Sequence, residues 1–173
     1  MSMDNNNLRE QLKANYPEFF EKYPEAPISE PIKCLNLVMK KEFAEAILKG
    51  EKTVEYRSYS KHYVDRLFDK KVMDWGDNNV AEEDLDLYME VCEPLRWVEK
   101  IHFHNYNNTW FLDVTVKGVF TVPVTRENVD ILKRDYNSDE LEEMCNDLDK
   151  MKEQNRPIFF VFPIDKILDT NLK

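Results

Sequence analysis

The eight residues from Gly50 to Arg57 (GEKTVEYR) constrain the fold of this chain more than any other stretch. Residues 41–49 carry apolar side chains at the i, i+4 spacing of a helix, and a glycine directly after such a segment favours a helix end. Val54 and Tyr56 then alternate with polar residues, which is the period of a β-strand with one buried face. The stretch therefore predicts a helix, a turn and a strand in direct succession.

The polar positions of this strand form a candidate binding site. Thr53, Glu55 and Arg57 share the face that we expect to point away from the core, and Lys52 stands where the strand begins. Arginine offers a planar fork of donors, glutamate offers acceptors and lysine offers a mobile ammonium, so the group can hold a small polar ligand. The alternative is a solvated Glu55–Arg57 ion pair, worth about 0–1 kcal/mol to stability.

The spacing Gly-x-Lys-x-x-Glu-x-Arg, preceded by a strand-like segment at 35–39 and a helix-like segment at 43–49, resembles the signature of the ASCH family, whose fold is related to the PUA domain. The resemblance covers roughly residues 33 to 169 and weakens after the motif. It implies an α+β fold built on a PUA-like curved β-barrel or sheet with flanking helices. The mixed order of strands and helices, without regular βαβ alternation, favours the same class.

The resemblance also implies a function, namely recognition of RNA or of a modified nucleoside in a cleft beside this strand. A flipped base would stack on an aromatic ring such as Tyr59 or Tyr106, while Glu55 and Arg57 bond to its edge. The candidate ligand-binding residues are Lys52, Thr53, Glu55, Arg57, Tyr59, His104 and Tyr106.

Two other functions stay open. One branch of the family resembles an amidohydrolase of acylated cytidine that uses a lysine, a threonine three residues later and a glutamate from another strand. Lys52 matches the lysine and is the one catalytic candidate, whereas Glu55 stands at the threonine position, and the distant glutamate falls on Asp113 or Thr115. Another branch resembles a ribonuclease. A general-base lysine needs a lowered pKa, which a nearby glutamate opposes, so binding ranks above catalysis. The third function is a protein-interaction or regulatory domain.

The charge distribution limits the possible partners. The chain has a net charge of −10, so we expect no broad binding to double-stranded DNA. Residues 33–75, which include the motif, hold ten Lys or Arg and seven Asp or Glu, while residues 76–93 hold seven acids and no base. A local nucleotide site near the motif is therefore compatible with the negative net charge of the chain.

We predict two regions in this chain of 173 residues. Residues 1–32 are expected to form a helical N-terminal arm and a proline-rich linker, and residues 33–173 the main domain. Phe19, Phe20 and Tyr23 are too apolar to remain in solvent, so they should pack on the main domain or contact a protein partner.

Further along, we expect a short strand or loop at 72–75, a helix over 82–91, and a hairpin of strands at 97–104 and 110–122. Thr125 should cap one helix, and a capping-box-like entry near 137–140 should begin another. A buried strand over 157–162 should end at Pro163.

Metals and cofactors are not expected. The three cysteines form no Cys-x-x-Cys pair, and no Gly-x-Gly-x-x-Gly or Walker-type run is present. His102 and His104 have a spacing that suits two metal ligands, but Asp113 is the one candidate for a third, so we predict no metal site. The polar residues 1–7 and the lack of a long apolar run predict a cytoplasmic protein without a membrane partner.

Overall fold

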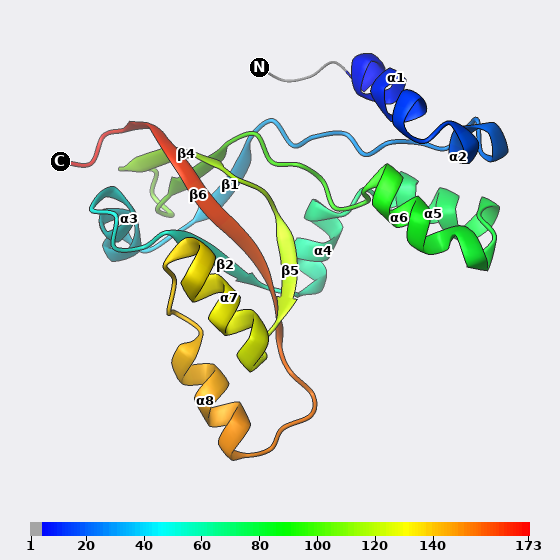
Figure 1. Cartoon of the computed structure of the whole chain (residues 1–173). Helices are drawn as coiled ribbons and strands as arrows, with labels where there is room; N and C mark the ends of the chain where they lie inside the picture. Colours follow the sequence, from blue (N-terminus) through cyan, green and yellow to red (C-terminus); the bar gives the residue numbers. More distant parts are fainter. Residues whose placement is uncertain (1–4) are drawn as a thin grey trace. The chain divides into compact units, whose positions relative to one another are not determined.

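The computed structural model describes residues 5–173, so residues 1–4 of the predicted arm lie outside the described part. The chain forms two compact units, which Figure 1 shows in sequence colours. The helical unit contains residues 5–31 and 64–97, and the barrel unit contains residues 32–63 and 98–173. The sequence did not indicate that residues 64–97 group with the N-terminal segment.

The helical unit is built from short helices around one apolar cluster. Its elements are α1 (Asn5–Asn15), α2 (Pro17–Lys22), α5 (Lys70–Asn79), the 3-10 helix η1 (Glu82–Asp84) and α6 (Leu85–Cys92), and α4 (Lys61–Leu67) leads into it from the barrel unit. Phe19, Phe20 and Tyr23 are buried in this cluster with residues of α5 and α6. A Cβ on Gly76 would lie 2.3 Å from the ring of Tyr88, so a glycine is required there.

Residues 72–75 are helical, so the prediction of a short strand or loop is wrong. The Asp69 side chain accepts hydrogen bonds from the backbone N–H groups of Lys71 and Val72 and thereby caps α5. Trp75 stacks on Tyr88 at 5.8 Å between ring centroids. The helix predicted over 82–91 is confirmed by η1 and α6.

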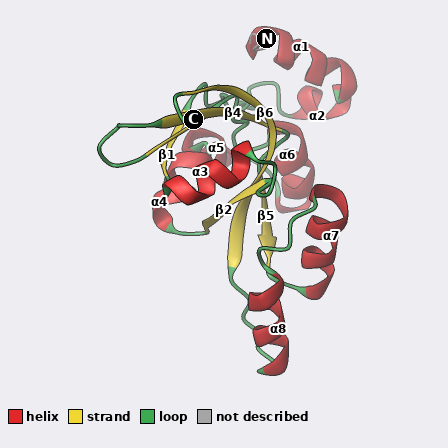
Figure 2. Ribbon diagram, turned by 90° about the vertical axis from the view of Figure 1, so that its left-hand side faces the viewer, coloured by secondary structure: helices red, strands yellow, loops and turns green. Residues whose placement is uncertain are grey.

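The barrel unit is a mixed sheet of six strands with flanking helices. The strands are β1 (Leu35–Val38), β2 (Val54–Ser58), β3 (Ile101–His104), β4 (Phe111–Val116), β5 (Phe120–Pro123) and β6 (Ile158–Thr170). Their order is β1-β3-β4-β6-β2, β5 pairs with β6, and β1 and β3 are the parallel pair. Figure 2 shows how strongly β4 and β6 curve. The predicted α+β class, with a curled half-barrel sheet and flanking helices, is confirmed.

Pro163 does not end the last strand, as the sequence had suggested, because it lies where β6 changes neighbours. Before this residue β6 pairs with β2 and β5, and after it with β4. The carbonyl of Pro163 accepts a hydrogen bond from Lys117 N–H at 2.9 Å. The strand predicted over 110–122 is divided into β4 and β5 by residues 117–119.

Helices α3 (Lys41–Leu48), α7 (Arg126–Tyr136) and α8 (Glu142–Lys150) flank the sheet. Apolar residues of α7 and α8 pack with Val54, Val122 and Val161 from three strands, and Figure 1 shows both helices on this side of β2. Thr125 caps α7 as predicted. The predicted capping-box entry is absent from the described α8, which begins at Glu142 after a left-handed residue at Asn137.

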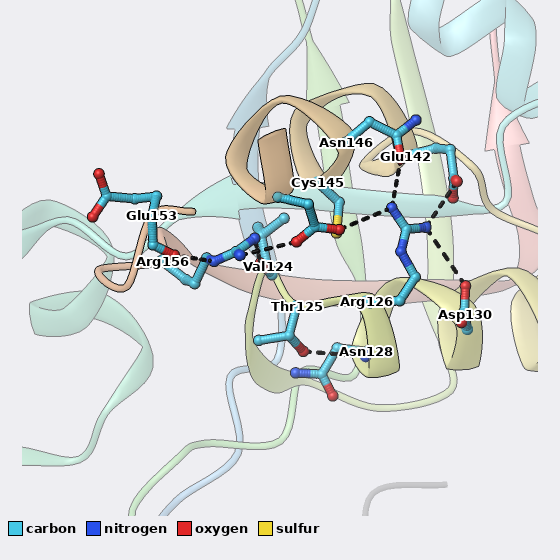
Figure 3. A network of polar contacts seen from close by, with 11 residues as sticks. Val124, Thr125, Arg126, Asn128, Asp130, Glu142, Cys145, Asn146, Glu153 and Arg156 are labelled. Atoms are coloured by element: carbon cyan, nitrogen blue, oxygen red, sulfur yellow. Dashed lines mark hydrogen bonds and ion pairs between the residues drawn. The ribbon is translucent and has the colours of Figure 1, made fainter. Parts of the chain in front are cut away.

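An exposed polar network joins α7 to α8 (Figure 3). Arg126 of α7 donates to Glu142, Asn146 and Asp149 of α8. Arg156, just before β6, donates to Asp149 at 2.9 Å. These contacts link the two helices to each other and to the segment just before β6.

Candidate functional site

Both faces of β2 are covered by other parts of the barrel unit. Val54 is fully buried on the side of α7 and α8, as the sequence predicted. The prediction that Glu55 and Arg57 point away from the core is wrong. They pair with Phe162 and Phe160 of β6, which are fully buried, and directly paired residues share a face. Only 6% of Glu55 is exposed.

Arg57 joins three parts of the barrel unit. Its Nε donates to Glu55 Oε1 at 3.2 Å, Nη1 donates to the Tyr63 hydroxyl at 3.0 Å, and Nη2 donates to the Val38 carbonyl at 2.9 Å. Val38 ends β1, which stands at the opposite end of the strand order from β2. The guanidinium therefore bridges the two ends of the curled sheet.

Glu55 keeps one carboxylate oxygen without a donor. Oε2 is buried, and no hydrogen-bonding group of residues 5–173 reaches it. Burial raises the pKa of Glu55, and the charges of Lys52 and Arg57 oppose this rise. A buried acceptor without a donor lowers the stability of the fold. Protonation of this oxygen, or a hydrogen bond donated by a ligand, would remove that loss.

Lys52 and Thr53 contact residues that are distant from them in the sequence. The Lys52 ammonium lies 2.6 Å from Glu140 Oε1, and its side chain is 9% exposed. Thr53 Oγ1 donates to the Tyr136 carbonyl at 2.5 Å. Both contacts are to the end of α7 and the following α7–α8 connection, residues 137–141. The motif residues thus divide between two neighbouring sets of contacts.

Tyr56 is hydrogen-bonded to the same α7–α8 connection. Its hydroxyl is 2.7 Å from the Ser138 hydroxyl, and Ser138 is 5% exposed. Burial raises the pKa of Tyr56 to about 12, so the phenol stays neutral. The rings of Phe43 and Tyr56 lie 5.7 and 5.8 Å from the Lys52 ammonium.

Tyr59 follows β2 and supplies an exposed aromatic surface beside Arg57. Its ring stacks on Phe160 with centroids 5.0 Å apart and an angle of 21° between the planes. The side chain is 45% exposed. Because Phe160 is the direct partner of Arg57, Tyr59, Arg57 and Glu55 follow one another along one face, from exposed to buried.

His104 and Tyr106 belong to the β3–β4 hairpin. His104 Nδ1 lies 2.8 Å from the Asn105 carbonyl, and Tyr106 is 87% exposed. No described contact joins either residue to Arg57 or Glu55. His102 is hydrogen-bonded to Asp113 through Nδ1. Within residues 5–173 no three His, Cys, Asp or Glu side chains are grouped as metal ligands.

Four site residues were not found from the sequence. Tyr63 and Ser138 had no signal beyond their polarity, and Glu140 lies 88 residues from Lys52. Phe43 was assigned to the buried stripe of a helix, but it is 43% exposed and faces Lys52. Its spacing from Ile47 fits a buried stripe as well as the rim of a site.

No family model and no curated protein matches this chain. The structure is similar to the crystal structure of a serine-to-alanine mutant of ZmASCH from Zymomonas mobilis, with 16% sequence identity and a TM-score of 0.39. The match covers 80% of this chain and 71% of that chain.

Of the helices in the described chain, none has both the length and the apolar character needed to cross a membrane.

Proposed function

We propose that the barrel unit binds a nucleobase, from RNA or from a modified nucleoside, along the face that carries Glu55, Arg57 and Tyr59. The observation that carries this proposal is the buried Glu55 oxygen without a donor, next to an arginine and an exposed aromatic ring. Burying a polar atom without a partner destabilises a fold, and a ligand that donates a hydrogen bond to Glu55 Oε2 would remove this cost.

The chemistry of the face suits the edge of a base such as cytosine. Glu55 Oε2 can accept a hydrogen bond from an exocyclic amino group. Arg57 has five N–H donors, of which three are engaged, so it can also donate to the adjacent ring nitrogen or carbonyl. The Tyr59 ring provides a surface for stacking, which contributes about 1–3 kcal/mol per base in single-stranded complexes.

Binding is better supported than catalysis. A general base needs a free nitrogen lone pair, whereas the Lys52 ammonium is ion-paired with Glu140 at 2.6 Å. The threonine of the amidohydrolase pattern is replaced by Glu55, which is buried against Arg57. Amide hydrolysis and ribonuclease activity therefore remain secondary possibilities, to be assayed on any ligand that binds.

A thermal-shift screen of the full chain tests the proposal. The ligands are the four nucleosides, acylated and methylated cytidines, and short single-stranded RNAs, each at low and at moderate salt. A ligand at 100 times its Kd stabilises the protein by about 2.7 kcal/mol, which the screen detects. We expect a base-specific shift that persists at moderate salt. A shift with RNA at low salt alone would indicate phosphate contacts without a base site.

Two matched variants assign the stacking residue. Tyr59→Leu should remove the shift, whereas Tyr106→Leu should keep it, because Tyr106 lies on a separate hairpin. The reverse result would move the site to the hairpin. If no ligand shifts the melting temperature, the nucleobase proposal fails, and a protein partner for the domain becomes the better hypothesis.

A further inference from the structure

The second set of contacts at β2 holds a cation that is paired within the chain. The Lys52 side chain is 9% exposed and is flanked by the rings of Phe43 and Tyr56. Its partner Glu140 is less confined, with 37% of the side chain exposed. The cation is therefore held in place by packing, while the anion stands at the surface.

The α7–α8 connection can release Glu140 without detaching from β2. Two other hydrogen bonds join this part of the chain to residues 53–56. Thr53 Oγ1 donates to the Tyr136 carbonyl at 2.5 Å, and the hydroxyls of Tyr56 and Ser138 are 2.7 Å apart. Lys52 is the partner that the structure gives to the Glu140 carboxylate. A rotation of this one side chain would open the ammonium to another anion.

We infer that the Glu140 carboxylate holds the place of a ligand phosphate at Lys52, so that the site takes phosphorylated nucleosides in preference to free ones. This inference rests on the proposed nucleobase site and adds the second half of its ligand. Lys52 stands three residues before Glu55, just before β2 begins, and its charge opposes the burial that raises the pKa of Glu55. A base at Glu55 and its phosphate at Lys52 then belong to one ligand.

The charges of the two anions favour replacement of the Glu140 carboxylate by a phosphate at Lys52. A phosphate carries more negative charge than a carboxylate and offers more acceptor oxygens, and lysine binds phosphate as a point charge. Replacing Glu140 by glutamine keeps an oxygen that can accept from Lys52 but removes the competing charge. An ion pair of this kind is worth up to about 1 kcal/mol, so its removal should tighten phosphate binding about fivefold.

Calorimetric titration of the full chain tests the inference. The ligands are cytidine, cytidine 5′-monophosphate, the dinucleotide CpC and inorganic phosphate. The proteins are the wild type, Glu140→Gln, Lys52→Gln and the control Glu143→Gln, which removes the same charge from an exposed position of α8. We expect the monophosphate to bind the wild type more tightly than cytidine does. Comparison of CpC with the monophosphate shows whether the site takes a phosphodiester or a terminal phosphate.

The variants separate this inference from the nucleobase proposal. Glu140→Gln should tighten monophosphate binding about fivefold and leave cytidine unchanged, Glu143→Gln should alter neither, and Lys52→Gln should abolish the advantage of the phosphate. Equal effects of the two glutamate variants would overturn the inference. Cytidine binding without any phosphate advantage would overturn it and leave the base site standing. Phosphate binding that responds to Glu140→Gln, without nucleoside binding, would overturn the base site and leave only the phosphate half of the inference at Lys52. Failure of every ligand would overturn both.

Discussion

Arg57 and Arg126 are both bound to carboxylates, but in opposite surroundings. The Arg57 side chain is 17% exposed and its partner Glu55 is 8% exposed, whereas Arg126 and Glu142 are 39% and 34% exposed. Arg126 has four polar partners and joins two helices at the surface (Figure 3). Arg57 has three and bridges the ends of the sheet. From this difference we expect that burial, more than the number of partners, determines how much each ion pair contributes to stability.

The largest effect is expected from Arg57→Met. The variant removes the charge that partners a buried carboxylate, and breaking such a pair costs about 3–5 kcal/mol. Urea denaturation at neutral pH measures the loss in the free energy of unfolding. The free energy of unfolding of Arg57→Lys should lie between those of Arg57→Met and the wild type, because lysine keeps the charge but lacks the fork of donors. A loss no larger than that of Arg126→Met would show that the comparison is wrong.

A smaller effect on the free energy of unfolding, which depends on pH, is expected from Glu55→Gln. Burial raises the folded-state pKa of Glu55 above its usual 4.5, so the folded state retains this proton to higher pH than the unfolded chain does. The stabilising contribution of the group is complete below pH 4.5 and is lost as the pH rises through the folded-state pKa. Glutamine does not titrate. The stability of the variant relative to the wild type should therefore increase with pH in this window, and a difference independent of pH would contradict the account.

Tyr56→Phe tests the opposite face of β2, where the polar contact is a neutral hydrogen bond. Removal of the hydroxyl leaves the buried Ser138 without this partner and should cost about 1 kcal/mol. Urea denaturation of Tyr56→Phe, Ser138→Ala and the double variant measures the coupling between the two residues. If the two single losses simply add, the hydroxyls do not depend on each other.

The smallest effect is expected from Arg126→Met. Three of its four partners are exposed and Glu142 is half-buried, so salt should screen most of these contacts, stability in urea should change little, and any change should shrink as salt is added. A large loss that persists at high salt would show that this network supports the packing of α7 on α8. In that case exposure would be a poor guide to the strength of ion pairs in this protein.

Local features of the fold were predictable because they depend on neighbouring residues. Gly50 has the left-handed φ of 75° that a helix end favours, and Thr125 accepts the capping hydrogen bond from Asn128. The alternation in β2 correctly placed Glu55 with Arg57 and opposite Val54. Periodicity identifies which residues share a face, but it does not reveal what covers that face.

The features that were missed depend on distant parts of the chain. Glu55 is buried because β6 brings Phe160 and Phe162 beside it, and Lys52 meets Glu140 across 88 residues. Residues 72–75 were missed for a local reason, since Asp69 is a helix cap whose signal was overlooked. The composition of the candidate site thus required the structure, while its motif residues were visible in the sequence.

The protonation of the Glu55 carboxyl can be measured directly, with and without a bound nucleotide. The protein is labelled with ¹³C at its glutamate side chains, and the carboxyl resonance of Glu55 is recorded by NMR as a function of pH. The same titration is then repeated with saturating cytidine 5′-monophosphate. A base that donates a hydrogen bond to Oε2 stabilises the charged form. We therefore expect the nucleotide to lower the pKa of Glu55. A ligand that binds and leaves this pKa unchanged would contradict it.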